Sequence, residues 1–162
     1  MSEPSLVEKR HFLELAIAEA IRGARAGQGG PFGAVVVKDG VVLARAANAV
    51  VANRDPTAHA EVQAIRAACV ALGSFRLDGC DLYASCEPCP MCLGAIWWAR
   101  LRALYFAATR ADAAAAGFDD AVFHRASGGV DAACPVRREQ LVCDGADTPF
   151  AVYASLPERV RY

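Results

Sequence analysis

Two short segments bring together residues that can bind a metal ion and move protons. The first is His59-Ala60-Glu61, and the second holds the pair Cys89 and Cys92, which begins thirty positions later (89 − 59). One imidazole and two thiolates are good zinc ligands, and a set of three protein ligands leaves a fourth position for water, as in catalytic zinc sites. Since Glu61 is not needed as a ligand, the pattern predicts hydrolytic zinc chemistry.

The expected local geometry supports this chemistry. Cys89 and Cys92 lie three residues apart at a predicted helix start, so their side chains share a face, and the helix dipole favours the thiolates. Glu61 lies about 200° around its helix from His59, which turns it toward the substrate. Bound zinc makes hydroxide available near neutral pH, and Glu61 can pass the proton to a ring nitrogen and then to a leaving amine. The products are a carbonyl compound and ammonia.

Each residue taken alone has a simpler interpretation. Two nearby cysteines can be buried thiols without a metal, a histidine can cap a helix, and a glutamate in a first turn can complement the helix dipole. Cys86 also forms a C-x-x-C pair with Cys89. We predict that Cys86 is not a ligand, because Cys89 and Cys92 occupy the P-C-x-x-C pattern. The two segments together favour a zinc site.

Composition narrows the class of protein. A chain of 162 residues with 22% charged residues predicts one globular domain over residues 1–162. The net charge of −1 gives no general attraction to nucleic acid or to anionic membranes. Seven cysteines, three of them within residues 86–92, favour metal binding in a reducing compartment over a disulfide scaffold. No leader-like or membrane-spanning apolar run is present, so we expect a cytoplasmic protein without a membrane partner.

The first half of the chain shows clear periodicities. Residues 5–26 repeat apolar side chains at three and four, which predicts an amphipathic helix. Residues 33–38 and 41–46 are β-branched runs around Asp39-Gly40, a strong hairpin signal, and residues 48–57 form a polar loop. Residues 59–72 again have helical spacing and stop at Gly73.

The second half continues with alternating strands and helices. Residues 81–85 predict a short strand ending at the cysteines, residues 89–100 a nearly all-apolar helix buried on most sides, and residues 103–107 another strand. Such alternation predicts parallel strands with crossover helices. Residues 112–116 look helical, and a further strand near 136–142 and a helix near 149–156 precede a tail at residues 157–162.

Longer strings carry a family resemblance. The histidine and cysteine segments match the H-x-E…P-C-x-x-C signature of zinc-dependent base deaminases. The sequence resembles the cytidine/deoxycytidylate deaminase superfamily and, within it, the bacterial guanine deaminases. This closer resemblance rests on GGPFGAV (29–35), DPTAHAEV (55–62), SCEPCPMCLGAI (85–96), and DAA with AGFDD (112–114 and 116–120). It implies an α/β class, a three-layer α/β/α fold with a central five-stranded mixed sheet, and a homodimer with exchanged C-terminal segments.

The resemblance also assigns roles to residues. It implies that Zn²⁺ is held by His59, Cys89 and Cys92, that Glu61 is the proton shuttle, and that Asp120 is a second catalytic acid near the exocyclic amine. It further implies that Asn48 hydrogen-bonds the purine, that Phe32 packs on the base, and that Tyr162 in the tail closes over the pocket. Taken alone, Asn48 is a turn residue, Phe32 a core residue, Asp120 a solvated loop acid and Tyr162 a frayed terminus.

The resemblance thus implies hydrolysis of guanine at C2 to xanthine and ammonia. Within the superfamily, the alternative substrate is another small aminated ring or a nucleoside, such as cytosine, an aminotriazine or guanosine. A tRNA adenosine deaminase shares the zinc motif but needs a basic surface, and here the arginines form only small clusters. A third interpretation is a zinc-stabilised binding module without catalysis, which Glu61 disfavours.

Overall fold

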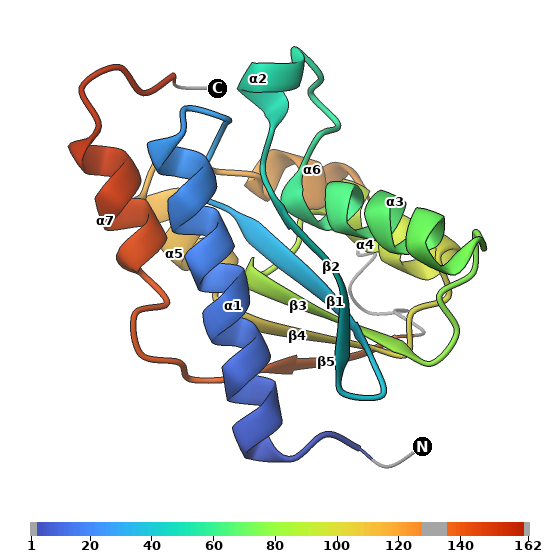
Figure 1. The fold of residues 1–162 in the computed structure, drawn as a ribbon. Coiled ribbons are helices and arrows are strands. Elements are labelled where there is room, and N and C mark those ends of the chain that lie inside the picture. Colours follow the sequence, from blue (N-terminus) through green and yellow to red (C-terminus); the bar gives the residue numbers. More distant parts are fainter. Residues whose placement is uncertain (1–2, 128–135, 161–162) are drawn as a thin grey trace.

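The centre of the protein is a five-stranded mixed sheet between two layers of helices. The computed structural model describes residues 3–127 and 136–160 (Figure 1). The strands lie in the order β2-β1-β3-β4-β5; their bounds are β1 Gly33–Lys38, β2 Val41–Ala47, β3 Cys80–Cys86, β4 Ala103–Ala108 and β5 Arg137–Gln140. β1 is antiparallel to β2 and β3, whereas β3, β4 and β5 are parallel. The predicted α/β class and five-stranded mixed sheet are confirmed.

Helices cover both faces of this sheet. Their bounds are α1 Leu6–Arg25, α2 Val50–Asn53, α3 Ala60–Leu72, α4 Pro90–Trp98, α5 Arg110–Ala115, α6 Ala121–Ala126 and α7 Thr148–Ser155. α1 lies across one face with α7 beside it, and α3 and α4 cover the other face (Figure 1). The short helices α5 and α6 follow β4, near the carboxyl ends of the parallel strands. The three predicted layers are therefore present.

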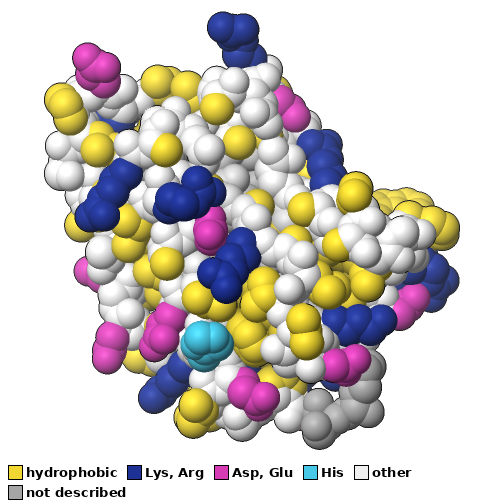
Figure 2. All heavy atoms as spheres, viewed as in Figure 1, with side chains coloured by type: hydrophobic (Ala, Val, Ile, Leu, Met, Phe, Trp, Pro, Cys, Tyr) yellow, Lys and Arg dark blue, Asp and Glu magenta, His cyan; other side chains and the backbone are white. Residues whose placement is uncertain are grey.

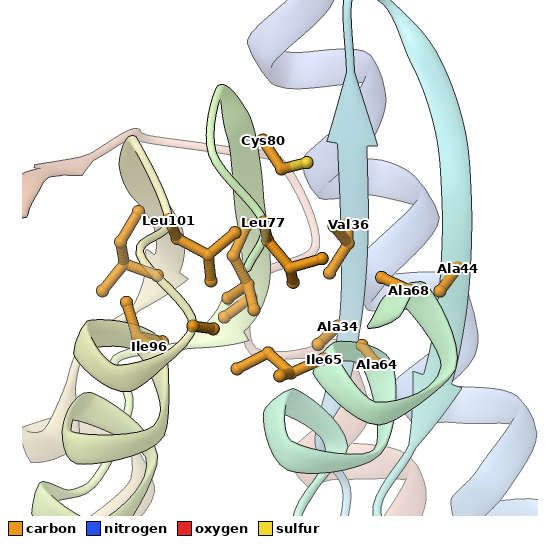
Figure 3. Packing of buried hydrophobic residues seen from close by; sticks show 14 of the residues in the cluster. Ala34, Val36, Ala44, Ala64, Ile65, Ala68, Leu77, Cys80, Ile96 and Leu101 are labelled. Atoms are coloured by element: carbon orange, nitrogen blue, oxygen red, sulfur yellow. The ribbon is translucent and has the colours of Figure 1, made fainter. Parts of the chain in front are cut away.

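Alternation along the strands creates two separate cores. On β1, Val36 packs with α3 and α4, whereas Val35 and Val37 pack against α1. On β3, Leu82 joins the first core and Tyr83 the second, as the two-residue period of a strand requires. Figure 3 shows the first core, in which Ile65 of α3 and Ile96 of α4 belong to one cluster with Val36 and Leu77.

The first strand is placed by a tight turn and a close helix contact. Asp39 and Gly40 both have positive φ, at 49° and 76°, as the predicted two-residue hairpin turn requires. At the other end of β1, a Cβ on Gly33 would lie 2.1 Å from the carbonyl oxygen of Ala16 in α1. The missing side chain lets α1 sit directly on the sheet.

Helix α4 differs from the sequence prediction. Of its residues, Cys92, Leu93 and Ile96 are buried, but Trp98 is 78% exposed and Met91 39% exposed. The predicted burial on most sides is wrong for the single chain, because the sheet covers one face of this helix and leaves its outward face open. Within the predicted polar loop, four residues form α2, and α6 is a helix that the sequence pattern does not predict.

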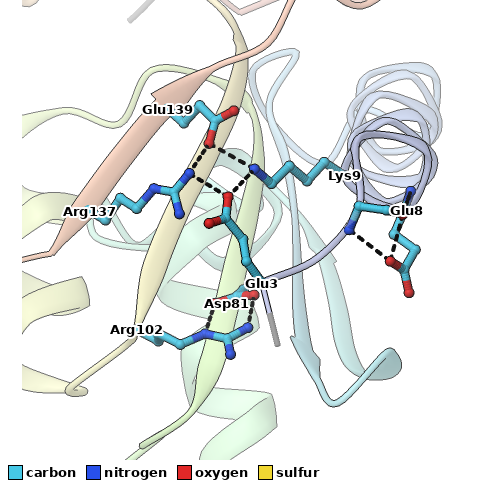
Figure 4. A network of polar contacts seen from close by, with 8 residues as sticks. Glu3, Glu8, Lys9, Asp81, Arg102, Arg137 and Glu139 are labelled. Carbon is cyan, nitrogen blue, oxygen red and sulfur yellow. Dashed lines mark hydrogen bonds and ion pairs between the residues drawn. The ribbon is translucent and has the colours of Figure 1, made fainter. Parts of the chain in front are cut away.

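A network of charges ties the amino terminus to the sheet. The Lys9 ammonium, almost buried in α1, donates to Glu3 at 2.8 Å and to Glu139 of β5 at 2.9 Å. Arg137 contacts the same two carboxylates, and Arg102 forms a bidentate pair with buried Asp81 (Figure 4). These pairs hold the edge strand β5 and the amino end of β3 to the rest of the fold.

None of the described helices is long and apolar enough to cross a membrane.

Candidate active site

Three predicted ligands meet where two helices begin. The Nδ1 atom of His59 lies 3.6 Å from the Cys89 Sγ and 3.5 Å from the Cys92 Sγ. Their ligand atoms all lie within 4.8 Å of one another, and this is the only such metal-binding group in the described residues. The structure therefore brings together the three residues predicted as metal ligands.

The helix starts explain this convergence. His59 and Cys89 are the N-cap residues of α3 and α4, with extended backbone at φ −66° and −69°. Their side chains thus project beyond the two helix ends, and Cys92 follows in the first turn of α4. Pro90 suits the first helical position because an amide there has no partner within the helix. Both positive helix ends face the thiols and favour thiolates.

The thiols differ in their acidity. Hydrogen bonding from Cys92, helped by His59, lowers the pKa of Cys89 to about 4 despite burial. The same contact with Cys89, together with burial, raises the pKa of Cys92 well above its ordinary value. Although burial opposes it, hydrogen bonding to Cys89 raises the pKa of His59, with smaller contributions from Glu61 and Asp120. Two ionisable sulfurs and an imidazole thus compete for protons at one point, which a divalent cation would relieve.

The separations fit zinc. A tetrahedral centre with bonds of about 2.3 Å to sulfur and about 2.0 Å to nitrogen places these atoms about 3.5 Å apart. The observed nitrogen to sulfur distances are 3.5 and 3.6 Å. His59, Cys89 and Cys92 would therefore hold the ion with little rearrangement. Three ligands leave a position for a water molecule or substrate.

Glu61 lies beside the ligands but is not one of them. It is in the first turn of α3, is only 7% exposed, and lines the same cavity as His59 and Cys89. Burial, reinforced by the charge of Cys89, raises its pKa. A carboxylate with a raised pKa accepts a proton more readily than an exposed one, as general acid and base catalysis needs.

A cavity of about 450 Å³ opens over these residues. One wall is aromatic: Phe32 meets Phe118 edge to face with ring centroids 5.0 Å apart, and Phe123 also lines the space. Polar groups on the cavity wall include Asn48, Glu87, Arg110 and Asp120. An apolar pocket of this size with a few converging polar groups is typical of small-molecule sites.

Asn48 is held in one orientation. It is 1% exposed, and its Oδ1 accepts hydrogen bonds from the backbone N–H of Gly30 at 3.1 Å and of Val50 at 3.2 Å. A Cβ on Gly29 would lie 2.1 Å from that oxygen, so a glycine is needed there. These two bonds, with the burial of the side chain, fix the orientation of the amide group.

Asp120 precedes α6 on the far wall of the cavity. Its Oδ2 lies 3.0 Å from the Nε2 of His124, and the Nδ1 of His124 lies 3.3 Å from Nη1 of Arg110. The neighbouring Asp119 is exposed and accepts from the backbone N–H of Ala121 at 2.9 Å. Of the two adjacent acids, Asp120 is the one that stands with the candidate site.

Other predicted residues fall as follows. Cys86 is buried on the cavity wall, where its thiol donates to the Thr109 carbonyl at 3.4 Å and burial raises its pKa, so it stays outside the ligand group as predicted. Tyr162 lies outside the described residues. The described part of the tail borders a surface cavity beside the end of α1 and Val51.

Sequence reasoning missed several residues that line the cavity or contact its wall. Phe118 lies inside the quoted string AGFDD, so that string already contained its signal. His124 follows Asp120 by four residues, a spacing that places both on one face of a helix. Arg110 and Phe123 gave no sequence signal, because their roles depend on how α5 and α6 fold over the cavity.

Comparison with known proteins places these residues in a family context. Residues 7–108 match the family model described as the cytidine and deoxycytidylate deaminase zinc-binding region. This span covers more than half of the chain and includes all three candidate ligands and Glu61.

Individual relatives have related activities. The chain is 59% identical over 114 residues to the guanine deaminase of Bacillus subtilis, covering 70% of this chain and 73% of that protein. The crystal structure of that enzyme superposes with a TM-score of 0.72 at 47% identity, covering 94% of this chain and 97% of the other. The tRNA-specific adenosine deaminase of Agrobacterium fabrum is 52% identical over 103 residues, 64% of this chain and 67% of that protein. A guanine deaminase structure from Nitrosomonas europaea matches at 30% identity, a TM-score of 0.76, and 96% and 95% coverage.

Proposed function

The protein belongs to the cytidine and deoxycytidylate deaminase family, and we propose that it hydrolyses guanine to xanthine and ammonia. The observation that carries this proposal is the match to the Bacillus subtilis guanine deaminase, which spans 94% of the chain. A span of that length reaches well past residues 7–108, the part of the chain that matches the zinc-binding family model. The cavity also has the size and the aromatic lining that suit a planar base.

The zinc ion that this family binds supplies the Lewis acidity by which a water molecule becomes nucleophilic at neutral pH. His59, Cys89 and Cys92 would hold this ion beside the cavity. Glu61 accepts one proton from the attacking water and delivers it to a ring nitrogen. It then carries a second proton, from the hydroxyl formed on the base, to the departing amine, which leaves as ammonia. The raised pKa of Glu61 suits both transfers.

The remaining proposed roles concern orientation of the base. Asn48 hydrogen-bonds the purine, and Phe32 packs against the ring. Asp120 approaches the exocyclic amine from the opposite wall and assists its protonation. We retain Tyr162 as a residue that closes over the bound base.

The direct test is ammonia release by the zinc-loaded protein against guanine, guanosine, adenine, cytosine and an aminotriazine, with ultraviolet detection of xanthine. We expect guanine to be turned over far ahead of the others. Turnover of another ring with guanine inert would contradict the substrate assignment while keeping the zinc chemistry. No turnover of any aminated base by the zinc-loaded protein would support a binding module instead.

A second arm tests the proton shuttle. Glu61 and Asp81 are the two buried acids in the described residues, at opposite ends of the sheet. We expect Glu61→Gln to lower kcat by about a thousandfold while zinc content stays constant. Asp81→Asn is the matched control and should keep kcat per folded protein. A Glu61→Gln enzyme with most of its turnover would remove Glu61 from the mechanism.

One alternative has a specific observation in its favour, the 52% identity to a tRNA-specific adenosine deaminase. Such an enzyme needs a basic surface for phosphates. Here Arg102 is paired with Asp81, and Arg137 with Glu3 and Glu139. Figure 2 shows acidic and basic side chains interspersed on one face of the molecule. We expect no tRNA shift in a low-salt gel; salt-sensitive binding would favour the alternative.

We further propose a homodimer in which a second copy covers the outward face of α4. The support is the apolar surface left open there, with Trp98 78% exposed and stacked with the Arg100 guanidinium. Exchange of C-terminal segments stays a prediction, since α7 packs on α1 of its own chain. Light scattering should give twice the chain mass, and Trp98→Glu should halve it; a monomeric wild-type protein would contradict the dimer.

Free thiols at all described cysteines fit a cytoplasmic setting, which we propose as the location.

A further inference from the structure

A chain of three side chains runs along one wall of the candidate active site. Asp120 Oδ2 lies 3.0 Å from His124 Nε2, and His124 Nδ1 lies 3.3 Å from Arg110 Nη1. Asp120 and His124 are four residues apart around the first turn of α6, whereas Arg110 begins α5. Asp120 and Arg110 both line the cavity, so the chain starts and ends at the substrate space.

The contact with Arg110 fixes where the imidazole proton lies. A guanidinium carries donors and no acceptor, so it can only donate to Nδ1. Nδ1 must then hold its lone pair, and the ring proton is on Nε2, the atom that faces Asp120. The pair is therefore a hydrogen bond that Nε2–H of His124 donates to the Asp120 carboxylate.

In this arrangement the second oxygen of the Asp120 carboxylate can accept a hydrogen bond from a ligand in the cavity. Among the residues that the structure describes, Oδ1 of Asp120 has no hydrogen-bond partner. The side chains of Asp120 and His124 are 24% and 11% exposed, so water competes weakly for the bond between them. A carboxylate held by one oxygen keeps the other pointing in a fixed direction.

We propose that His124 is a positioning residue that aims the Asp120 carboxylate into the cavity, with Arg110 holding the imidazole in the required tautomer. The inference rests on the proposed function, because it assigns the aimed oxygen to the amine of the base. His124 itself does not touch the substrate. Carboxylates that orient an active-site histidine are common; here the histidine orients the carboxylate.

The kinetic test removes and then restores the donor. We expect His124→Leu to lower kcat and kcat/KM together by about tenfold or more, with KM nearly unchanged, because only the transition state uses the aimed oxygen. His124→Gln keeps an N–H near the position of Nε2 and should recover most of the rate. His11→Leu, an exposed histidine on α1, is the matched control. A fully active His124→Leu, or a His124→Gln as slow as His124→Leu, would overturn the proposal.

The spectroscopic test is independent of turnover. The chain has three histidines, so imidazole ¹⁵N resonances can be assigned with single variants. We expect His124 to carry its proton on Nε2 and none on Nδ1, and Arg110→Ala to mix the two tautomers. A proton on Nδ1, or on both nitrogens, would overturn the inference.

The two tests separate failure of this inference from failure of the proposed function. If the wild-type enzyme does not act on guanine, the substrate assignment falls, while the tautomer measurement still decides the geometry. If the wild-type enzyme does act on guanine and Asp120→Asn slows it, an unchanged rate in His124→Leu contradicts the positioning role alone.

Discussion

In the described part of the chain, buried ionisable side chains lie near both ends of strand β3, but Asp81 at the amino end has an arginine partner and Glu61 at the carboxyl end does not. At the amino end, Asp81 is paired with Arg102 through two hydrogen bonds of 2.8 and 2.5 Å. At the carboxyl end, Glu61 and the thiols lie beside a cavity, and the described residues include no ion-pair partner for Glu61 comparable to Arg102. The pKa values of neighbouring acids also differ: bonds to Arg137 and Lys9 lower the pKa of Glu3, an exposed residue near the amino end, to about 2, whereas burial raises the pKa of Glu61.

The difference shows how a functional cluster can be told from a structural one. Partners within the protein favour the charged form of each group and stabilise the fold. Ionisable groups that are buried together without such partners disfavour one another's charged forms, so they do not stabilise the fold by themselves. A bound cation changes that balance, so the unfavourable end is the one that marks the site.

The largest expected effect comes from removing a buried thiol at each end. Cys92 and Cys80 are both fully buried, one among the ligands and one at the start of β3. We expect Cys92→Ala to abolish stoichiometric zinc binding and lower turnover by more than about a hundredfold. Cys80→Ala should lower the unfolding free energy by about 1 kcal/mol and leave zinc content unchanged. Metal analysis after gel filtration measures the zinc content of both variants. Equal zinc content in the two variants would contradict the proposed difference between the two ends of β3.

A smaller effect is expected at the amino end, in stability rather than turnover. Arg102→Ala leaves the Asp81 carboxylate, whose side chain is 3% exposed, without its partner. Breaking a buried pair in this way costs about 3 kcal/mol. Denaturant unfolding should show this loss of unfolding free energy. The kcat per folded protein should stay within about twofold of the wild-type value. An Arg102→Ala protein with normal stability and reduced kcat would mean that the amino end of β3 also takes part in function.

Sequence patterns predict a helix, strand or turn well where the residues within that element are enough to determine its structure. The β-branched runs around Asp39-Gly40 predict the hairpin, and the helix starts at His59 and Cys89 predict where ligands meet. The outward face of α4 shows the limit: apolar residues such as Trp98 predict a helix, but not what covers it. Helix α6 has only six residues, Ala121–Ala126, and no strong apolar period, so the sequence did not indicate it.

The candidate site divides in the same way. His59, Glu61, Cys89 and Cys92 are close in sequence to the helix starts that position them, so spacing alone brought them together. The wall that holds Arg110 and His124 depends on how α5 and α6 fold back over the strand ends. Likewise, Lys9 and Glu139 meet across 130 positions, and no local pattern indicates such a pair.

The smallest predicted effect concerns Glu3 and its dependence on pH. Its folded pKa of about 2 lies below the ordinary 4.5, so its bonds to Arg137 and Lys9 contribute stability that is fully present above pH 4.5. That contribution is lost as the pH falls toward 2, because the carboxyl is then protonated in the folded state too. Since the group is exposed, we expect a modest difference in melting temperature between wild type and Glu3→Gln at neutral pH, shrinking across this window. Subtracting the two melting curves cancels the effect of acid on the thiolate ligands, which both proteins share. A difference that grew as the pH fell would show that Glu3 does not stabilise the fold through its charge, and the amino end would then lose part of its contrast with the active site.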